Sequence, residues 1–238
     1  MHCLILAATS IEIAPFMEAL QDKEVIKNIP DTDVLISGIG LTATTYALTK
    51  YLHIKRPDCI IQAGLGGCFD TSIPLGTVMA IKKETIADQS VIELKSLKTL
   101  FDLKLLPEEA PPYKKGWLPN DCALLKLFKG KKVRGISVNE ITTDKKKVQL
   151  YKDTFNPVVE SMEGAALHYV ARMENIPFIQ LRAISNYIAE RNKKKWDMKS
   201  SIANLNHALL KLLTDMPLTF LPLNNLSSSL SLGSHPFL

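Results

Sequence analysis

Short apolar runs alternate with amphipathic segments along most of the chain. The apolar runs are bounded by turn-forming residues and have the length of buried strands. They occupy residues 3–8, 34–37, 59–63, 78–81, 133–138 and 177–184. Residues 42–53, 163–173 and 198–213 carry apolar side chains at intervals of three and four, which predicts helices. This alternation predicts an α/β domain with three layers.

Two segments depart from this pattern. Residues 95–128 are rich in proline and poor in periodicity, which favours a long excursion or a lid over sheet core. Residues 217–238 are rich in serine and asparagine and continue no helical period. We therefore expect one catalytic domain over residues 1–216, followed by a flexible C-terminal tail.

Composition and charge narrow the class of protein. With 238 residues and 46% hydrophobic content, the chain can bury a full core. The net charge of +5 comes largely from short lysine runs at 129–132, 145–147 and 193–195. Such runs are typical of solvated helix ends or loops. The functional alternative is that they attract an anionic ligand. They lack the interleaved aromatic residues of a nucleic-acid surface, so we expect no nucleic-acid partner.

The cysteines and the N-terminus indicate an intracellular protein without a metal centre. Cys3, Cys59, Cys68 and Cys122 form no CxxC pair and have no histidine at metal-ligand spacing, so buried, reduced thiols are expected. The first apolar segment is too short for a signal peptide, and no apolar stretch reaches membrane-spanning length. The sequence thus predicts a cytoplasmic protein with no membrane association, no metal and no cofactor.

Chemistry-bearing residues gather where predicted strands end, which is where ligands bind in open α/β sheets. Glu12 follows the first strand, near the start of a helix, where it could also simply complement the helix dipole. Two glycine-rich turns follow later strands, Ser37-Gly38-Ile39-Gly40 and Gly64-Leu65-Gly66-Gly67. Glycines there would let backbone N–H groups approach an oxygen-rich ligand, although such turns are common.

The third junction is the most specific. Glu163 lies in the run Glu160-Ser161-Met162-Glu163-Gly164-Ala165-Ala166, which opens a predicted helix. That helix leads into a strand that ends Arg182-Ala183-Ile184-Ser185-Asn186. A carboxylate at a helix start and an amide past a strand end could contact opposite ends of one nucleoside. Taken singly, Glu163 could instead be a helix-dipole partner and Asn186 a cap or turn residue.

The order of these motifs, SGIG, GLGG, SMEGAA and RAISN, resembles the family that cleaves nucleosides at the N-glycosidic bond, over residues 1 to about 215. More narrowly, residues 159–167 and 182–196 resemble futalosine hydrolases of the menaquinone pathway. Methylthioadenosine/S-adenosylhomocysteine nucleosidases generally have aspartate where this chain has Asn186. The resemblance implies a nucleoside phosphorylase-like α/β/α fold with a central mixed β-sheet and a homo-oligomer.

The resemblance also implies roles for the junction residues. Glu12 would orient and deprotonate the attacking water, since a glutamate carboxylate can accept a proton at neutral pH. Glu163 would accept hydrogen bonds from the ribose hydroxyls, and Met162 would pack against the sugar. Gly38, Gly64, Gly66 and Ser185 would support the site. Arg182 would lie near the water and restrain a carboxylate, or pair with an acid beneath the site.

Asn186 bears on which base is released. An aspartic acid can protonate N7 of a 6-aminopurine, whereas an amide cannot deliver a proton but can donate hydrogen bonds to N7 and O6 of a 6-oxopurine. Hypoxanthine therefore fits better than adenine, although an asparagine amide can also bind adenine through N6 and N7. For the carboxylated acyl part of futalosine, Arg191 and Trp196 are candidates, with a solvated basic turn as the alternative.

Three other functions stay open. A purine nucleoside phosphorylase would use phosphate in place of water, but Glu12 would repel phosphate and the first loop lacks arginine. An adenine-releasing nucleosidase is disfavoured by Asn186. A nucleoside-binding protein that kept the fold without the activity is disfavoured by the presence of both Glu12 and Glu163. The expected partners are a small nucleoside substrate and water.

Overall fold

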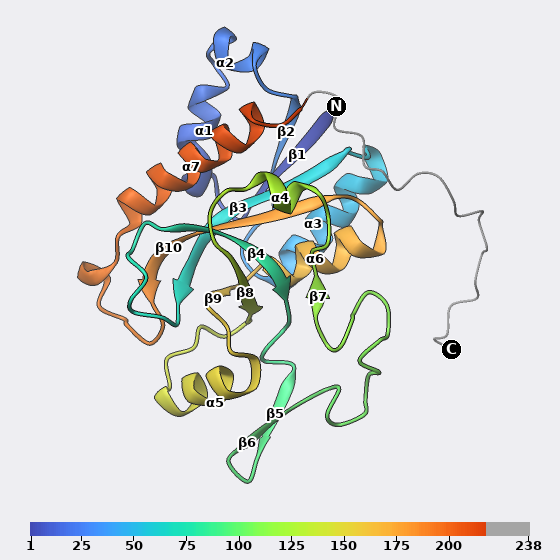
Figure 1. Ribbon diagram of the computed structural model, residues 1–238, viewed down its shortest axis with the longest axis vertical. Coiled ribbons are helices and arrows are strands. Elements are labelled where there is room, and N and C mark those ends of the chain that lie inside the picture. Colours follow the sequence, from blue (N-terminus) through green and yellow to red (C-terminus); the bar gives the residue numbers. More distant parts are fainter. Residues whose placement is uncertain (218–238) are drawn as a thin grey trace, which may run out of the picture.

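A central mixed sheet organises the molecule, and the computed structural model describes residues 1–217 of it (Figure 1). Its strands are β1 (His2–Ala7), β2 (Asp31–Ile36), β3 (Cys59–Cys68), β4 (Val78–Glu84), β7 (Leu118–Pro119), β8 (Lys132–Ser137), β9 (Val159–Ser161) and β10 (Phe178–Tyr187). A separate hairpin pairs β5 (Ser90–Glu93) with β6 (Ser96–Thr99). The order along the sheet is β10-β4-β8-β9-β3-β1-β2, with β7 beside β4.

The sheet closes on itself through its longest strands. Strand β3 pairs with β1 along its first half and with β9 at its end, while β10 pairs with both β3 and β4. Because β4 also pairs with β8, and β8 with β9, the strands β3, β10, β4, β8 and β9 form a closed ring. The pairs β3–β9, β4–β10 and β4–β7 are antiparallel and the other pairs of this sheet are parallel. The predicted mixed sheet is confirmed.

Helices cover both faces of the sheet. Their bounds are α1 (Ala14–Ala19), α2 (Lys23–Lys27), α3 (Leu41–Ile54), α4 (Leu124–Leu127), α5 (Lys145–Phe155), α6 (Gly164–Met173) and α7 (Met198–Thr214), with 3-10 helices η1 (Ser10–Ile13) and η2 (Lys193–Lys195). Helices α1 and α7 lie on one face, and α3 and α6 on the other (Figure 1). The predicted three layers are confirmed.

Strand β1 shows why a buried strand has a continuous run of apolar residues in the sequence. Cys3, Ile5 and Ala7 pack into the core under α1 and α7, whereas Leu4 and Leu6 pack into the core under α3 and α6. Since both faces are buried, no polar residue can alternate with the apolar ones.

The predicted strands and helices are all present, and shorter elements were missed. Strand β9 has only three residues, two of them polar, and it forms because β3 and β8 pair with it on either side. Helix α5 begins in the lysine run at 145–147, where the Asp144 side chain caps it by accepting a hydrogen bond from the Lys146 N–H at 2.8 Å. It ends at Asn156, which has a left-handed conformation.

The proline-rich segment 95–128 packs against the outer side of α6. The Arg172 side chain donates hydrogen bonds to the carbonyl oxygens of Pro112 and Pro119, and Tyr113 packs against Tyr169. The segment is an excursion, as predicted, although it contains β6, β7 and α4. Of the predicted tail, 217–238, only Pro217 lies within the described residues. Within residues 1–217, no helix combines the length and apolarity needed to cross a bilayer.

Candidate active site

The predicted junctions meet around a cavity of about 340 Å³ at the carboxyl ends of the strands. It is lined by residues that lie at the ends of β3 and β10 or follow β1 and β9, including Glu12, Gly66, Met162, Glu163 and Asn186. The sequence placed these residues at separate strand ends, and the sheet brings them together. No residue of 95–128 is among the lining residues described, so the excursion does not cover the cavity in this single chain.

Glu12 is held by three donors. Its Oε1 accepts a hydrogen bond from the Leu65 N–H at 2.9 Å, and its Oε2 accepts bonds from the Thr9 N–H at 3.1 Å and the Thr9 hydroxyl at 3.2 Å. The bond to the Thr9 N–H belongs to the capping box of helix η1, so the carboxylate has a structural role at the start of this helix. A carboxylate has about four acceptor positions, which leaves room for one more donor, such as a water molecule.

Glu163 is buried and paired with Arg182. Its Oε2 accepts a hydrogen bond from Arg182 Nη1 at 3.1 Å, and its Oε1 accepts one from the Gly40 N–H at 3.2 Å. It is the N-cap residue of α6, yet its side chain makes no capping bond to that helix. The carboxylate is therefore turned away from its own helix, and two acceptor positions remain for a ligand.

Arg182 is fully buried and restrains the site from below. Besides Glu163, its guanidinium donates to the Leu65 carbonyl at 3.0 Å and to Gln62 Oε1 at 3.1 Å. It makes no ion pair with Glu12 within the described residues. The sequence left two interpretations of Arg182 open, restraint of a carboxylate and pairing with an acid beneath the site. The carboxylate with which it pairs is that of Glu163.

Asn186 lies at the end of β10 beside Ser185. The Ser185 hydroxyl donates a hydrogen bond to Asn186 Oδ1 at 2.9 Å, and the Asn186 NH₂ group donates one to the Tyr187 carbonyl at 3.2 Å. One acceptor position on Oδ1 and the second N–H of the amide therefore remain open to a ligand. Asn186 is thus a strand residue and not the helix cap or turn residue that the sequence left open.

The glycines act mainly by leaving room. A side chain at Gly64 would lie 2.5 Å from Arg182 Nη1, and one at Gly66 would lie 2.8 Å from Val159. Gly38 has a φ of +82°, which favours glycine. The backbone N–H groups of Leu65 and Gly40 are used to hold Glu12 and Glu163, in contrast to the expectation that such groups would meet the ligand directly.

A buried polar network beneath the cavity was missed by sequence reasoning. The Gln180 amide accepts a hydrogen bond from Arg182 Nε at 3.1 Å and donates to Glu84 Oε2 at 3.1 Å and to His168 Nε2 at 2.9 Å. His168 Nδ1 donates to the Leu118 carbonyl at 2.8 Å, and the Ser137 hydroxyl donates to Glu84 Oε1 at 2.9 Å. Burial raises the pKa of Glu84 to about 8 and lowers the pKa of His168 to about 3.

The candidate acyl-binding residues line the rim of the cavity. The Arg191 guanidinium lies 5.8 Å from the centroid of the Trp196 ring, and the Trp196 indole N–H donates to the Glu190 carbonyl at 3.0 Å. Glu190 also pairs with Lys195 at 2.7 Å, which anchors this turn. Among residues 1–217, no group of three or more histidine, cysteine or acidic side chains has the arrangement of a metal site.

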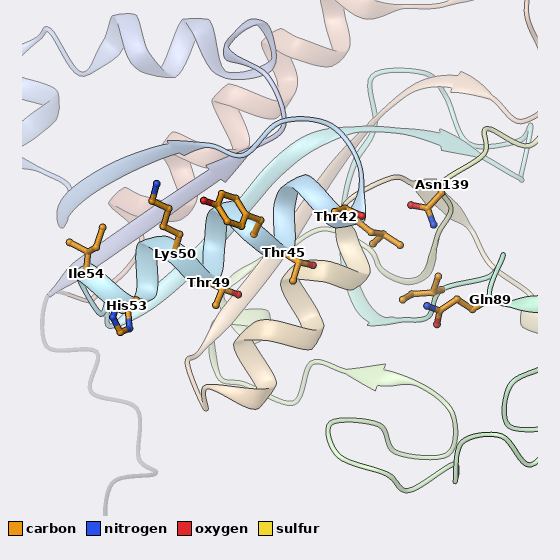
Figure 2. Close-up of a pocket in the computed structure, with 11 residues that line it drawn as sticks. Thr42, Thr45, Thr49, Lys50, His53, Ile54, Gln89 and Asn139 are labelled. Atoms are coloured by element: carbon orange, nitrogen blue, oxygen red, sulfur yellow. The ribbon is translucent and has the colours of Figure 1, made fainter. Parts of the chain in front are cut away.

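A larger groove of about 950 Å³ runs along the outer side of α3, away from Glu12 and Asn186. Thr42, Thr45, Thr49 and His53 lie in a row along the helix, and Asn139 lies near its N-terminal end (Figure 2). The groove is shallow and carries none of the junction residues. The smaller cavity, where carboxylates and an amide converge, is the candidate active site.

The chain matches known proteins over most of its length. The family model described as the phosphorylase superfamily matches residues 22–214, which include Glu163 and Asn186 but begin after Glu12. The chain is 25% identical to a futalosine hydrolase from Streptomyces coelicolor, over 89% of this chain and 95% of that protein. It is 28% identical to a 5'-methylthioadenosine/S-adenosylhomocysteine nucleosidase from Haemophilus influenzae, over 67% of this chain and 69% of that one.

The fold also matches a solved structure of a futalosine hydrolase. A futalosine hydrolase mutant from Helicobacter pylori superposes with a TM-score of 0.74, covering 91% of this chain and 100% of that chain, at 17% sequence identity. This likeness confirms the predicted nucleoside phosphorylase-like fold. On the family match, which spans far more than half of its residues, the chain belongs to the phosphorylase superfamily.

Proposed function

We propose that the protein hydrolyses the N-ribosidic bond of a 6-oxopurine nucleoside, with futalosine as the substrate and hypoxanthine as the released base. Both kinds of named relative, a futalosine hydrolase and methylthioadenosine/S-adenosylhomocysteine nucleosidases, support hydrolysis of an N-ribosidic bond. The observation that carries the choice of base is the Asn186 amide, which donates only one of its two N–H groups within residues 1–217. An amide in this orientation offers an N–H donor and has no proton to transfer to the base.

The carboxylates supply the remaining chemistry of the proposed reaction. Breaking an N-ribosidic bond requires a positioned water, support of an oxocarbenium-like sugar and acceptance of negative charge by the base. Glu12, with one acceptor position open, binds the water and takes its proton as the oxygen attacks the ribosyl carbon and the C–N bond breaks. The base leaves with the electron pair of that bond as an anion and is then protonated from solvent. Glu163, with two positions open, accepts hydrogen bonds from the ribose hydroxyls, and Met162 packs against the sugar.

In the described part of the chain, Glu12 is not paired with a cationic side chain, which favours water over phosphate as the nucleophile. Glu12 has no ion-pair partner among residues 1–217, and Arg182 is turned to Glu163. A phosphate entering beside Glu12 would meet the negative charge of its carboxylate. Hydrolysis is therefore preferred to phosphorolysis.

The direct test is chromatographic detection of free base after incubation with futalosine, inosine, methylthioadenosine or S-adenosylhomocysteine in phosphate-free buffer. Release of hypoxanthine from futalosine alone supports the proposal. Release of adenine contradicts the role given to Asn186, and release only after phosphate is added indicates a phosphorylase. No release under any condition, together with tight binding of a nucleoside, indicates a binding protein.

We also propose that the protein is a homo-oligomer whose second copy covers α3. Tyr46 and Ile54 on this helix are 67% and 77% exposed, and the groove that they line reaches Leu41 and Asn139. Ile39 and Ile141, each two positions away from one of these residues in sequence, line the candidate active site. A copy seated on α3 would therefore also narrow the open cavity. Sedimentation of the wild type and of Tyr46→Arg tests this: an assembly weakened by the variant supports it, and a wild-type monomer contradicts it.

A further inference from the structure

The first turn of helix α6 takes its cap from a distant part of the chain. Glu163 is the N-cap residue, and a side chain at this position usually accepts a hydrogen bond from the backbone N–H two or three residues further on. Here the Ala165 N–H instead donates to the hydroxyl of Ser137, 28 residues earlier in β8, at 2.8 Å. The N–H group that an ordinary cap would give to the Glu163 carboxylate is therefore already occupied.

Ser137 is a rigid anchor for this bond. The residue is fully buried, and its backbone N–H and carbonyl oxygen pair with the Thr85 carbonyl and the Ala87 N–H, both at 2.9 Å. Its hydroxyl hydrogen is directed to Glu84 Oε1 at 2.9 Å, so a lone pair of the same oxygen faces the Ala165 N–H. The sheet thus sets both the position of this oxygen and the direction of its lone pairs.

The other N–H groups of this turn have longer hydrogen bonds. The Gly164 N–H donates to the Ser161 hydroxyl at 3.3 Å, and the N–H groups of Ala166 and Leu167 donate to the Glu163 carbonyl at 3.0 and 3.3 Å. Ser137 therefore accepts the shortest bond of the first turn and ties that turn to β8. Since Ser137 does not line the cavity, its effect on a ligand must pass through α6.

We infer that Ser137 is a positioning residue for the ribose site: by capping α6 in place of Glu163, it keeps the Glu163 carboxylate turned to the cavity. The inference rests on the proposed function, in which this carboxylate accepts hydrogen bonds from the ribose hydroxyls.

The physical reason is a competition between two N–H groups for one carboxylate oxygen. Glu163 Oε1 accepts from the Gly40 N–H, and Oε2 accepts from Arg182. Without the Ser137 hydroxyl, the Ala165 N–H would be buried without a partner, whereas the N–H of the half-buried Gly40 can turn to water. The buried group is the costlier one to leave unpaired. Either the first turn then shifts or Oε1 turns back to its own helix, and both movements withdraw an acceptor from the ribose.

Calorimetric binding of two uncleavable nucleosides measures whether the carboxylate meets the sugar. One probe is carbocyclic inosine, in which a methylene group replaces the ring oxygen so that no oxocarbenium-like centre can form. The other is its 2′,3′-dideoxy form, which lacks both hydroxyls. We expect the wild type to bind the hydroxylated probe at least about tenfold more tightly, as hydrogen bonds to a charged group predict. Equal affinity for the two probes, or no measurable binding of either, overturns the inference without any variant.

Ser137→Ala removes the cap and leaves every lining residue of the cavity unchanged. The preference for the hydroxylated probe should fall below about threefold, while affinity for the dideoxy probe changes by less than about twofold. The matched control is Ser201→Ala, which removes another fully buried hydroxyl, one that donates to the Ile184 carbonyl at 2.7 Å. The control should lose stability in urea yet keep the full preference. A Ser137→Ala protein that keeps the full preference overturns the inference and leaves Ser137 a structural cap.

Ser137→Cys covers the case in which the alanine variant does not fold. It keeps the approximate size of the side chain, but a sulfur atom is a weak acceptor. The preference for the hydroxylated probe should therefore fall at least about threefold. An unchanged preference in this variant also overturns the inference.

The outcome is separable from that of the proposed function. A protein that binds the probes in this pattern but releases no base from futalosine keeps the role of Ser137 and loses the proposed reaction. A protein that releases hypoxanthine from futalosine but whose Ser137 variants keep the full preference keeps the reaction and loses the role of Ser137.

Discussion

Two clusters of polar side chains lie against the same closed ring of strands, and they differ in how far their hydrogen bonds are used within the protein. The pocket cluster consists of Glu12, Glu163 and Asn186, which line the candidate active site. The buried cluster consists of Glu84, Ser137, His168 and Gln180, whose side-chain polar atoms all have partners within residues 1–217. Arg182 joins the two clusters through Glu163 on one side and Gln180 on the other.

The difference separates groups that act on a ligand from groups that hold them in place. A buried polar network in which every group is paired is rigid, and an incomplete one is costly. The pocket cluster keeps open acceptor and donor positions on half-buried or buried side chains, which is worthwhile only if a ligand completes them. The buried cluster instead fixes the orientation of Arg182, and through it that of Glu163.

Glu12→Gln is the variant expected to have the largest effect, because it removes the proposed proton acceptor from the pocket cluster. The rate constant kcat for base release should fall about 10²- to 10⁴-fold, the usual contribution of general acid–base catalysis. Substrate affinity should change little, since the amide still offers an oxygen to the Leu65 N–H. Single-turnover kinetics and equilibrium binding measure the two effects, with Glu18→Gln on the exposed side of α1 as the control. A full rate in Glu12→Gln would remove Glu12 from the mechanism.

Arg182→Met breaks the link between the clusters. It leaves the buried Glu163 carboxylate without its cation, and removing one partner of a buried ion pair costs about 3–5 kcal/mol of unfolding free energy. Urea denaturation measures this loss. The matched control, Arg56→Met, removes an exposed pair with Glu174 and should cost less than about 1 kcal/mol. Equal losses in the two variants would show that the buried pair contributes no more than the exposed one.

The pocket cluster could be predicted from the sequence because its members follow strand ends. Glu12, Glu163 and Asn186 each come at a boundary between an apolar run and a turn or helix, and the rule for parallel strands then places them together. The long buried strands could be predicted for a related reason. Strands buried on both faces contain runs of apolar residues that few other structures produce.

The buried cluster could not be predicted, since its environment is created by strand pairing over long separations. Glu84 follows Lys82 and Lys83, a sequence typical of a solvated strand end. It is buried because β4 extends to pair with β7 and β8. Gly135 in β8 leaves room for it, since a side chain there would begin 2.4 Å from Glu84 Oε2. The joining of Arg182 to Glu163 likewise depends on the folded sheet. No local pattern encodes these contacts.

The pH dependence of stability should report on the buried cluster through Glu84 and His168. Because burial raises the pKa of Glu84 from 4.5 to about 8, the folded protein holds a proton between these values that the unfolded chain has lost. Stability therefore falls as pH rises through this window. His168, with its pKa lowered to about 3, has the opposite effect, but only below about 6.5.

Urea midpoints at pH 6.5 and pH 8 isolate the Glu84 contribution. The wild type should lose on the order of 1–2 kcal/mol over this interval, and Glu84→Gln, which cannot titrate, should lose less. Activity at saturating substrate should change little in the variant if the amide keeps the bonds to Ser137 and Gln180. A wild-type stability that is flat or rises over this interval would show that Glu84 is ionised within the fold.

Arg191→Gln should have the smallest effect, because it changes the rim of the pocket cluster and leaves every internal bond in place. The exposed guanidinium lies over Trp196, and a solvated ion pair with a substrate carboxylate contributes about 1 kcal/mol or less. KM for futalosine should therefore rise up to about fivefold, with kcat unchanged, whereas KM for inosine, which has no carboxylate, should stay the same. Lys193→Gln on the neighbouring turn, which does not line the cavity, is the control. An equal change for both substrates would mean that Arg191 shapes the turn and does not contact the acyl group.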